Sequence, residues 1–205
     1  MVKVLIVIDY LLRHGETDWN SEQRIQGNTD ISLNANGLNQ ARQAADYLTR
    51  FDIEAIYSSN LSRAYETASI IATKLQKPHF IDKELTEVNM GRWEGSRWDD
   101  IKIEYIDYLP KWLNNLENIP APGGESYGQV QVRVVRAYKR IISKHSEDSN
   151  ILIVSHGIAI KTLIAYILGL SLNNLGNFEL LNASISTIEI KEKTRLISLN
   201  NICHL

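Results

Sequence analysis

The sequence lacks the features of a disulfide-bonded, membrane-spanning or polyanion-binding protein. Its 205 residues include one cysteine, Cys203, which excludes an intrachain disulfide and a cysteine-based zinc site. No apolar run is long enough to span a bilayer, and a net charge of −2 provides no basic surface for nucleic acid. We therefore expect a protein of the reducing, cytoplasmic compartment, with no nucleic-acid partner and no membrane association.

Repeats, low-complexity tracts and Gly/Ser linkers are also absent, and the length suits one domain, which we place at residues 1–205. The apolar N-terminus, residues 1–12, resembles a secretory signal only loosely. Asp9 interrupts this apolar segment, and no small-residue cleavage site follows it. We predict a buried strand there, and the role of the extra apolar residues 1–9 stays open.

Strand-like and helix-like segments alternate along the chain, which predicts an α/β fold with a mainly parallel sheet. Strands are expected within 2–13, 53–59, 77–85, 150–155, 184–190 and 195–201. Helices are expected within 34–51, 61–76 and 158–170, with a further long one through Val130 and Ile141. The last two strands flank the charged segment KEKT and indicate a hairpin.

Four of these strands end in residues that suit one anion site. RHG (13–15) closes the first strand and SHG (155–157) closes another, while Arg63 and Glu87 follow two more. Ligands in open parallel sheets bind beyond the carboxyl ends of the strands, so these groups should meet in one crevice. A cation and an imidazole at a buried strand end indicate a negatively charged ligand.

The residue types in this set favour a phosphoryl group. The planar guanidinium of arginine matches phosphate oxygens bidentately, and imidazole serves as a nucleophile in covalent catalysis. A nearby carboxyl group supplies the proton that a leaving alkoxide needs. The sequence contains neither a P-loop nor a carboxylate cluster with the spacing of a hard-cation site.

Four segments in order resemble the signatures of the histidine phosphatase superfamily, the phosphoglycerate mutase-like proteins. They are LLRHGETDWN, YSSNLSRAYETA, LTEVNMGRWEG and ILIVSHG. The resemblance runs from about residue 10 to about residue 200. It implies a three-layer sandwich: a mainly parallel central sheet flanked by helices, one antiparallel edge strand and a helical cap inserted around 93–125.

The resemblance also implies the site residues and their roles. His14 would be the nucleophile that becomes phosphorylated, and Glu87 would be the general acid and then the base that activates water. No metal and no cofactor are implied. Arg13 and Arg63 should depress the pKa of His14, because a like charge disfavours its protonated form. Phosphate or substrate contacts are implied for Arg13, Asn20, Gln26, Gly27, Arg63 and His156.

The phosphatase branch is favoured over the mutase branch. A mutase must exclude water, and related mutases carry inserted basic segments after the WEG region, whereas residues 96–115 here interleave acids with few bases. We expect a metal-independent hydrolase of small phosphate esters: α-ribazole 5′-phosphate, phosphoserine, sugar phosphates or a broad range. A cofactor-dependent phosphoglycerate mutase is the alternative, followed by a non-catalytic binding module. The sequence leaves a homodimer open.

Two readings of the tryptophan-rich middle segment also stay open. Met90, Trp93, Trp98 and Tyr105 either wall an apolar substrate pocket or pack the cap on itself. Met90 stands where related phosphoserine phosphatases tend to have histidine, although the tail SLNNICHL resembles theirs.

Overall fold

A mixed sheet forms the centre of the computed structural model, which describes residues 7–146, 149–190 and 194–205. Within these residues the sheet has six strands in the order β3-β2-β4-β1-β5-β6. The strands are β1 (Val7–Arg13), β2 (Ile53–Ser58), β3 (His79–Ile81), β4 (Asn150–Ser155), β5 (Ile185–Ile190) and β6 (Arg195–Asn201). The first four in sequence pair in parallel, which confirms the predicted α/β class.

The antiparallel part of the sheet differs in one detail from the expectation. β5 runs antiparallel to β1, but it is not the edge strand, because β6 pairs antiparallel with its outer side. The two strands form the predicted hairpin, and the connection at 191–193 lies outside the described residues. Residues 1–6 of the expected first strand also lie outside them.

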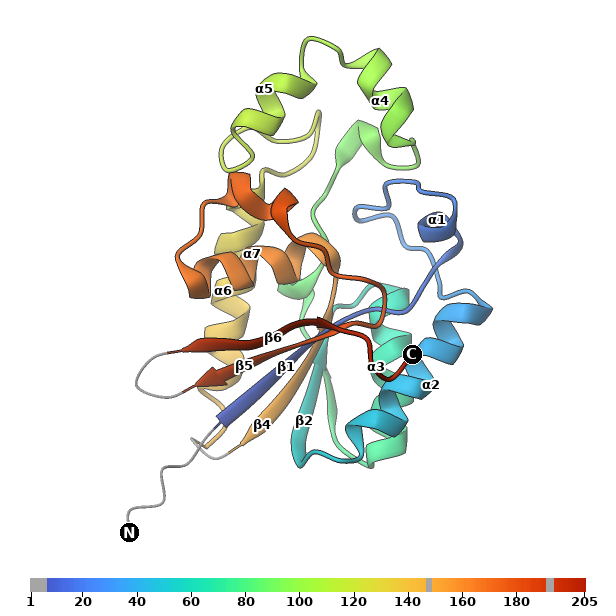
Figure 1. Cartoon of the computed structure of the whole chain (residues 1–205), viewed down its shortest axis with the longest axis vertical. Helices are drawn as coiled ribbons and strands as arrows, with labels where there is room; N and C mark the ends of the chain where they lie inside the picture. Colours follow the sequence, from blue (N-terminus) through green and yellow to red (C-terminus); the bar gives the residue numbers. More distant parts are fainter. Residues whose placement is uncertain (1–6, 147–148, 191–193) are drawn as a thin grey trace.

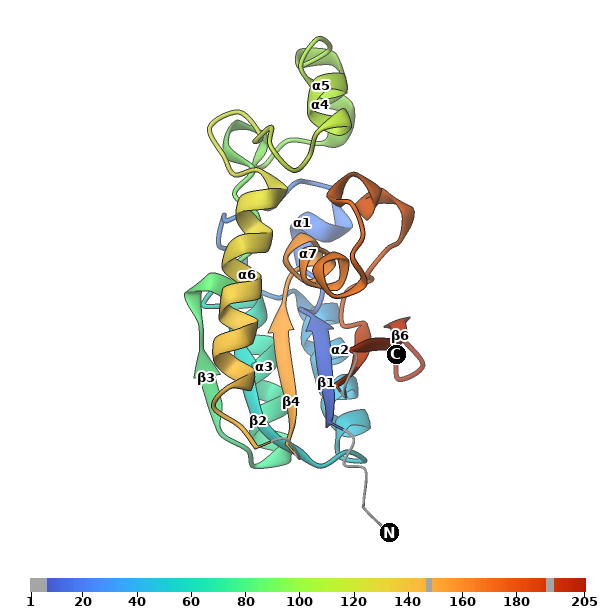
Figure 2. The same cartoon turned by 90° about the vertical axis from the view of Figure 1, so that its left-hand side faces the viewer.

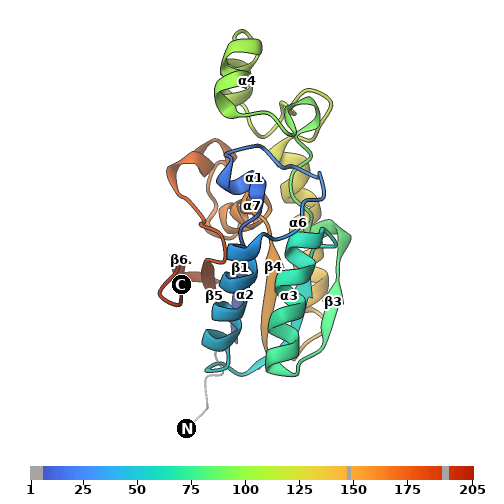
Figure 3. The same cartoon turned by 90° about the vertical axis from the view of Figure 1, so that its right-hand side faces the viewer.

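The alternation of side chains along the strands builds one core on each face of the sheet. Leu11, Ile151 and Ile153 are buried against α6 and α7, whereas Leu12 and Val154 are buried against α2 and α3. Figure 2 shows α6 and α7 in front of the sheet, and Figure 3 shows α2 and α3 on the opposite face. The three layers predicted from the resemblance are therefore present.

Helix boundaries follow local capping signals. The helices are α1 (Asp18–Ser21), α2 (Ala35–Leu48), α3 (Ser62–Leu75), α4 (Trp98–Glu104), α5 (Leu109–Asn114), α6 (Tyr127–Ile142) and α7 (Gly157–Leu168). Ser126 and Gln129 form a capping box at the start of α6, satisfying two otherwise unpaired N–H groups. α7 ends at Gly169, whose φ of 65° lies in the left-handed region that glycine adopts readily. No helix in the described ranges combines the length and apolar character that crossing a membrane requires.

A helical cap containing α4 and α5 lies beyond the carboxyl ends of β1 and β4 (Figure 1). Its interior is aromatic. The fully buried ring of Trp93 lies 4.9 Å from that of Trp112 and 5.6 Å from that of Tyr105, measured between ring centroids, in edge-on geometry. Aromatic pairs of this kind add stability beyond the area that they bury. These rings continue the core that α6 and α7 form on one face of the sheet, so the cap is joined to the main body above the end of the sheet where the site residues lie.

Candidate active site

The two histidine motifs meet at the end of the β1–β4 pair. Arg13 is in register with Ser155 across the parallel strands, and the backbone N–H of His14 donates to the carbonyl of Ser155 at 3.0 Å. His156 directly follows β4 and caps the start of α7, and its ring centroid lies 5.1 Å from that of His14. The strand pairing thus brings together two histidines separated by more than a hundred residues.

The ring of His14 is held as a neutral imidazole with one nitrogen available. Its Nδ1 lies 2.6 Å from the carbonyl oxygen of Gly15, which can only accept, so Nδ1 carries the proton. Nε2 is therefore the nitrogen with a lone pair. Burial, together with the cations Arg63 and Arg13, holds the pKa of His14 well below its usual range. The predicted direction is confirmed, but burial is the largest cause.

Arg63 stands in the first turn of α3 with its side chain fully buried. Its two Nη groups donate to the carbonyls of Thr29 at 2.8 Å and Gly27 at 2.7 Å. Burial lowers the pKa of Arg63 to about 10, so the guanidinium stays charged at neutral pH. These bonds fix the plane of the guanidinium while its Nε is left without a partner in the described structure.

Other buried nitrogens beside His14 also lack an acceptor among the described residues. Arg13 donates from Nη1 to the carbonyl of Leu180 at 2.5 Å, but its Nε has no partner. His156 is fully buried and neither of its ring nitrogens has a partner. Buried polar groups are nearly always hydrogen-bonded, so a cluster of exceptions indicates a ligand that supplies the acceptors.

Glu87 enters the same site from the loop after β3. Its carboxylate accepts hydrogen bonds from the backbone N–H groups of Val88, Ile158 and Ala159 at 2.9–3.2 Å. Two of these donors belong to the first turn of α7, where unpaired N–H groups favour an anion. A Cβ built on Gly157 would lie 3.7 Å from Glu87 Oε2 and 3.8 Å from Arg13 Nε, so the carboxylate and Arg13 flank the start of this helix.

Asn20 sits in the short helix α1. Its Oδ1 accepts from Thr17, both N–H and hydroxyl, and from the side-chain amide of Asn182 at 3.1 Å. With the oxygen occupied, the NH₂ group of Asn20 is the part of the amide that can donate to a ligand. Gln26 is largely buried, and its Oε1 has no partner in the described structure.

A cavity of about 400 Å³ joins these groups. Seven of the eight residues expected at the site line it, and the eighth, His156, is next to the ring of His14. The seven are Arg13, His14, Asn20, Gln26, Gly27, Arg63 and Glu87. The sequence motifs therefore converge as their positions at the strand ends indicated.

The outer lining of the cavity decides between the two readings of the tryptophan-rich segment. Met90 and Trp98 line the cavity, whereas Trp93 and Tyr105 pack inside the cap. Both readings thus hold, each for half of the residues. Further lining residues that the motifs did not indicate include Arg24, Tyr127, Lys161 and Glu179.

Two other residues, to which the sequence analysis assigned no role, support the histidine loop. Thr67 accepts from the N–H of Gly15 at 3.1 Å and donates to the carbonyl of Arg63 at 2.7 Å. The amide of Asn182 donates to the carbonyls of His14 and Gly15. Thr67 occupies a helical position with an ordinary residue type, and Asn182 lies in a loop before β5. Thr67 falls within the quoted segment YSSNLSRAYETA, but its residue type does not indicate this contact, and Asn182 lies outside the quoted segments.

Comparisons with known proteins agree with this geometry. Residues 10–202 match the model of the histidine phosphatase superfamily (branch 1). The chain belongs to this superfamily. Its similarity to a probable phosphoglycerate mutase GpmB from Enterobacter sp. (strain 638) is 40% identity over 189 residues, covering 92% of this chain and 87% of the relative. A putative phosphoserine phosphatase 2 from Hydrogenobacter thermophilus is 33% identical over 196 residues, covering 95% and 96%.

A solved histidine phosphatase structure extends the likeness to three dimensions. A phosphoserine phosphatase mutant from Entamoeba histolytica, in complex with phosphoserine, superposes with a TM-score of 0.85 at 33% identity. The match covers 97% of this chain and 99% of the other. The superfamily and the three-layer fold expected from the sequence are thus confirmed.

Proposed function

We propose that this protein is a hydrolase of small-molecule phosphate monoesters that works through a phosphohistidine at His14. The observation that carries the proposal is the neutral imidazole of His14 surrounded by buried donors that have no acceptor in the described structure: Arg13 Nε, Arg63 Nε and the ring of His156. A phosphoryl group supplies the negative oxygens that such donors require.

In the first step, Nε2 of His14 attacks phosphorus and the bond from phosphorus to the ester oxygen breaks. Arg13, Arg63, His156 and the amide of Asn20 donate to the phosphoryl oxygens, whose charge they stabilise in the transition state. The donors are already oriented by the carbonyls that hold the two guanidinium groups, so little reorganisation accompanies the reaction.

Glu87 is the proposed proton donor to the leaving oxygen and lines the cavity together with His14. In the second step, its carboxylate accepts a proton from water as the water oxygen attacks the phosphohistidine, which releases phosphate and the neutral imidazole. Gln26 and Gly27 are proposed to contact the remainder of the substrate. The mixed outer lining, with Trp98 and Met90 beside Lys161 and Glu179, suits a small organic phosphate with both apolar and polar parts.

A mutase is the second candidate, because the relative with 40% identity is a probable phosphoglycerate mutase. The two reactions share the first step and differ in whether water or a bound hydroxyl accepts the phosphoryl group. Conversion of 3-phosphoglycerate that depends on added 2,3-bisphosphoglycerate would identify the mutase. Release of inorganic phosphate without that dependence would identify the hydrolase.

The test compares wild-type protein with His14→Ala on p-nitrophenyl phosphate in the presence of EDTA. Wild type should release p-nitrophenol and, with a ³²P-labelled ester and an alkaline quench, should carry label on protein. The variant should show neither activity nor label. His79→Gln, a histidine on the edge strand β3 that bonds Ser58, is the matched control and should keep both. Turnover retained by His14→Ala would refute the nucleophile, and an inactive wild type would favour the binding module.

A further inference from the structure

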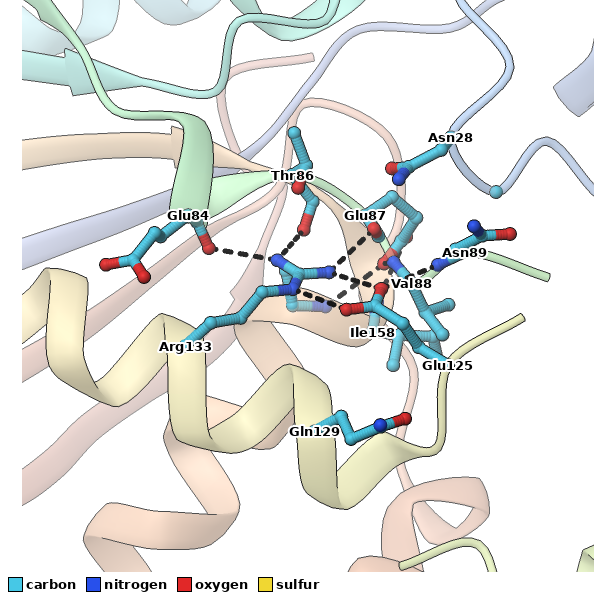
Figure 4. Close-up of polar contacts among 12 residues, drawn as sticks. Asn28, Glu84, Thr86, Glu87, Val88, Asn89, Glu125, Gln129, Arg133 and Ile158 are labelled. Atoms are coloured by element: carbon cyan, nitrogen blue, oxygen red, sulfur yellow. Dashed lines mark hydrogen bonds and ion pairs between the residues drawn. The ribbon is translucent and has the colours of Figure 1, made fainter. Parts of the chain in front are cut away.

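The side chain of Arg133, in the middle of α6, donates hydrogen bonds to the loop that carries Glu87 (Figure 4). Its Nη1 donates to the carbonyls of Glu84 at 2.9 Å and Thr86 at 2.7 Å, and Nη2 donates to the carbonyl of Glu87 at 2.8 Å. Nε and Nη2 also donate to the carboxylate of Glu125, both at 3.0 Å. A guanidinium has five N–H donors, so each has one acceptor.

Glu125 joins a second loop to the same network. One of its oxygens accepts from the backbone N–H of Asn89 at 2.9 Å, and its own N–H donates to the carbonyl of Asn89 at 2.8 Å. A Cβ on Gly124 would lie 2.2 Å from that carbonyl, so glycine is needed for the loops to come so close. The segment GGES, which the proposed chemistry does not use, thus packs directly behind the Glu87 loop.

Glu87 is therefore held at two points by different elements. α6 holds its main-chain carbonyl through Arg133, and the first turn of α7 holds its carboxylate through the N–H groups of Ile158 and Ala159. A displacement of the loop would change how the carboxylate sits at the helix and how far it lies from the leaving oxygen. Misplacement by about 1 Å reduces enzymatic rates about 100-fold in comparable cases.

We propose that Glu125 and Arg133 form a positioning pair that fixes the general acid Glu87, without contact between either residue and the substrate. The inference rests on the proposed function, because it assigns the pair a role in proton donation to the leaving group. Both residues are outside the cavity lining described above. The side chain of Arg133 is 13% exposed, so its removal would leave largely buried carbonyls without this donor.

The first test replaces the guanidinium of Arg133, with its five N–H donors, while keeping the positive charge. Arg133→Lys retains a cation but offers three donors from one point, so it cannot bond three carbonyls and a carboxylate together. Proton donation matters most when the leaving group is poor. We therefore expect kcat on an alkyl phosphate such as glycerol 2-phosphate to fall about 10- to 100-fold, and kcat on p-nitrophenyl phosphate to fall less than about threefold. Glu125→Gln should shift the ratio in the same direction.

The matched control is Arg136→Ala, one turn further along α6. Arg136 is exposed and, among the described residues, bonds the side chain of Glu84 alone, so this variant removes a cation and an ion pair from the same helix without touching the carbonyls. Both rates should stay at wild-type values. A double-mutant cycle completes the test, because Arg133→Lys should not change the ratio further in a Glu87→Gln background.

Hydrogen exchange adds a readout that does not need turnover. In Arg133→Lys the peptide spanning 84–91 should exchange faster than in wild type, whereas Arg136→Ala should leave it unchanged. Equal loss on both esters in a folded Arg133→Lys, or unchanged exchange in that peptide, would overturn the inference while leaving the phosphatase proposal intact. An inactive wild type would instead refute the proposed function and, with it, the positioning role of the pair in catalysis. Hydrogen exchange would still report whether Glu125 and Arg133 order the loop.

Discussion

Asp9 provides a measurable link between a buried charge and the stability of the fold. This residue lies in β1 with 1% of its surface exposed, and its carboxylate accepts a hydrogen bond of 2.7 Å from the hydroxyl of Tyr138 on α6. Burial raises the pKa of Asp9 from 3.8 to about 6, although the Tyr138 hydroxyl and the N–H of Ile151 act in the opposite direction. The perturbation is the substitution Asp9→Asn, which removes the titration.

The sign and size of the effect follow from linkage. Since the pKa is higher in the folded state, the folded protein binds the proton more tightly. The stabilising contribution is complete below about pH 3.8 and is lost as the pH rises through about 6. The full difference is about 3 kcal/mol, and about 1.4 kcal/mol of it falls between pH 5 and pH 8. The wild-type free energy of unfolding should therefore decline over this interval by that amount more than the Asp9→Asn value.

The assay is urea unfolding of both proteins at pH 5 and pH 8, with two-state behaviour checked by two spectroscopic probes. Asp107→Asn, at an exposed cap position, is the control and should keep the wild-type pH dependence. Tyr138→Phe removes a donor that lowers the pKa of Asp9, so it should make the decline steeper. Wild type and Asp9→Asn with the same pH dependence would refute the reasoning, and Tyr138→Phe carries the test if Asp9→Asn does not fold.

Two further predictions concern the site. Burial and the arginines hold the pKa values of His14 and His156 well below 6.5. As the pH falls, kcat/KM on p-nitrophenyl phosphate, corrected for substrate ionisation, should therefore show no loss with a midpoint near 6.5. Such a midpoint would contradict the neutral, buried imidazoles. The carboxylate of Glu94 accepts hydrogen bonds from the N–H groups of Asn28, Thr29 and Met90. Glu94→Gln should therefore lower the free energy of unfolding by about 1–3 kcal/mol. It should also weaken the binding of inorganic phosphate, measured by calorimetry. Unchanged phosphate affinity would show that Glu94 does not organise the loop that orients Arg63.

The sequence predicted the arrangement of strand ends well, because the signal there is physical. An apolar strand that stops at a cation and an imidazole brings those groups to the carboxyl edge of a parallel sheet, and the pairing of Arg13 with Ser155 then brings the two histidine motifs together. The alternation of strands and helices predicted the α/β class with a mainly parallel sheet, and the resemblance to the family supplied the three layers. The position of β6 outside β5 depends on which strand covers the free edge, and hydrophobic pattern does not encode that choice.

The supporting residues could not be predicted, because most of their partners are main-chain carbonyls and N–H groups. Arg133 lies on an amphipathic helix where an arginine ordinarily indicates a solvated face, and nothing in its residue type indicates three carbonyls more than 40 residues earlier. Asn182 acts in the same way on His14 and Gly15. Every residue has a carbonyl, so such contacts leave no compositional trace.

The balance of charge in the cavity favours a phosphate monoester as the ligand on physical grounds. Arg13 and Arg63 place two guanidinium groups beside the neutral ring of His14, and the carboxyl group of Glu87, bonded to the start of α7, carries the proton for the leaving oxygen in the proposed first step. Buried cations without a full set of acceptors are unfavourable, and a doubly charged phosphoryl group removes that penalty by satisfying the unpaired Nε atoms. A diester has a single negative charge and a second substituent on phosphorus where the donors converge. We therefore expect phosphate diesters to be turned over more slowly than monoesters, because the buried groups that hold the imidazole neutral favour a ligand with two negative charges.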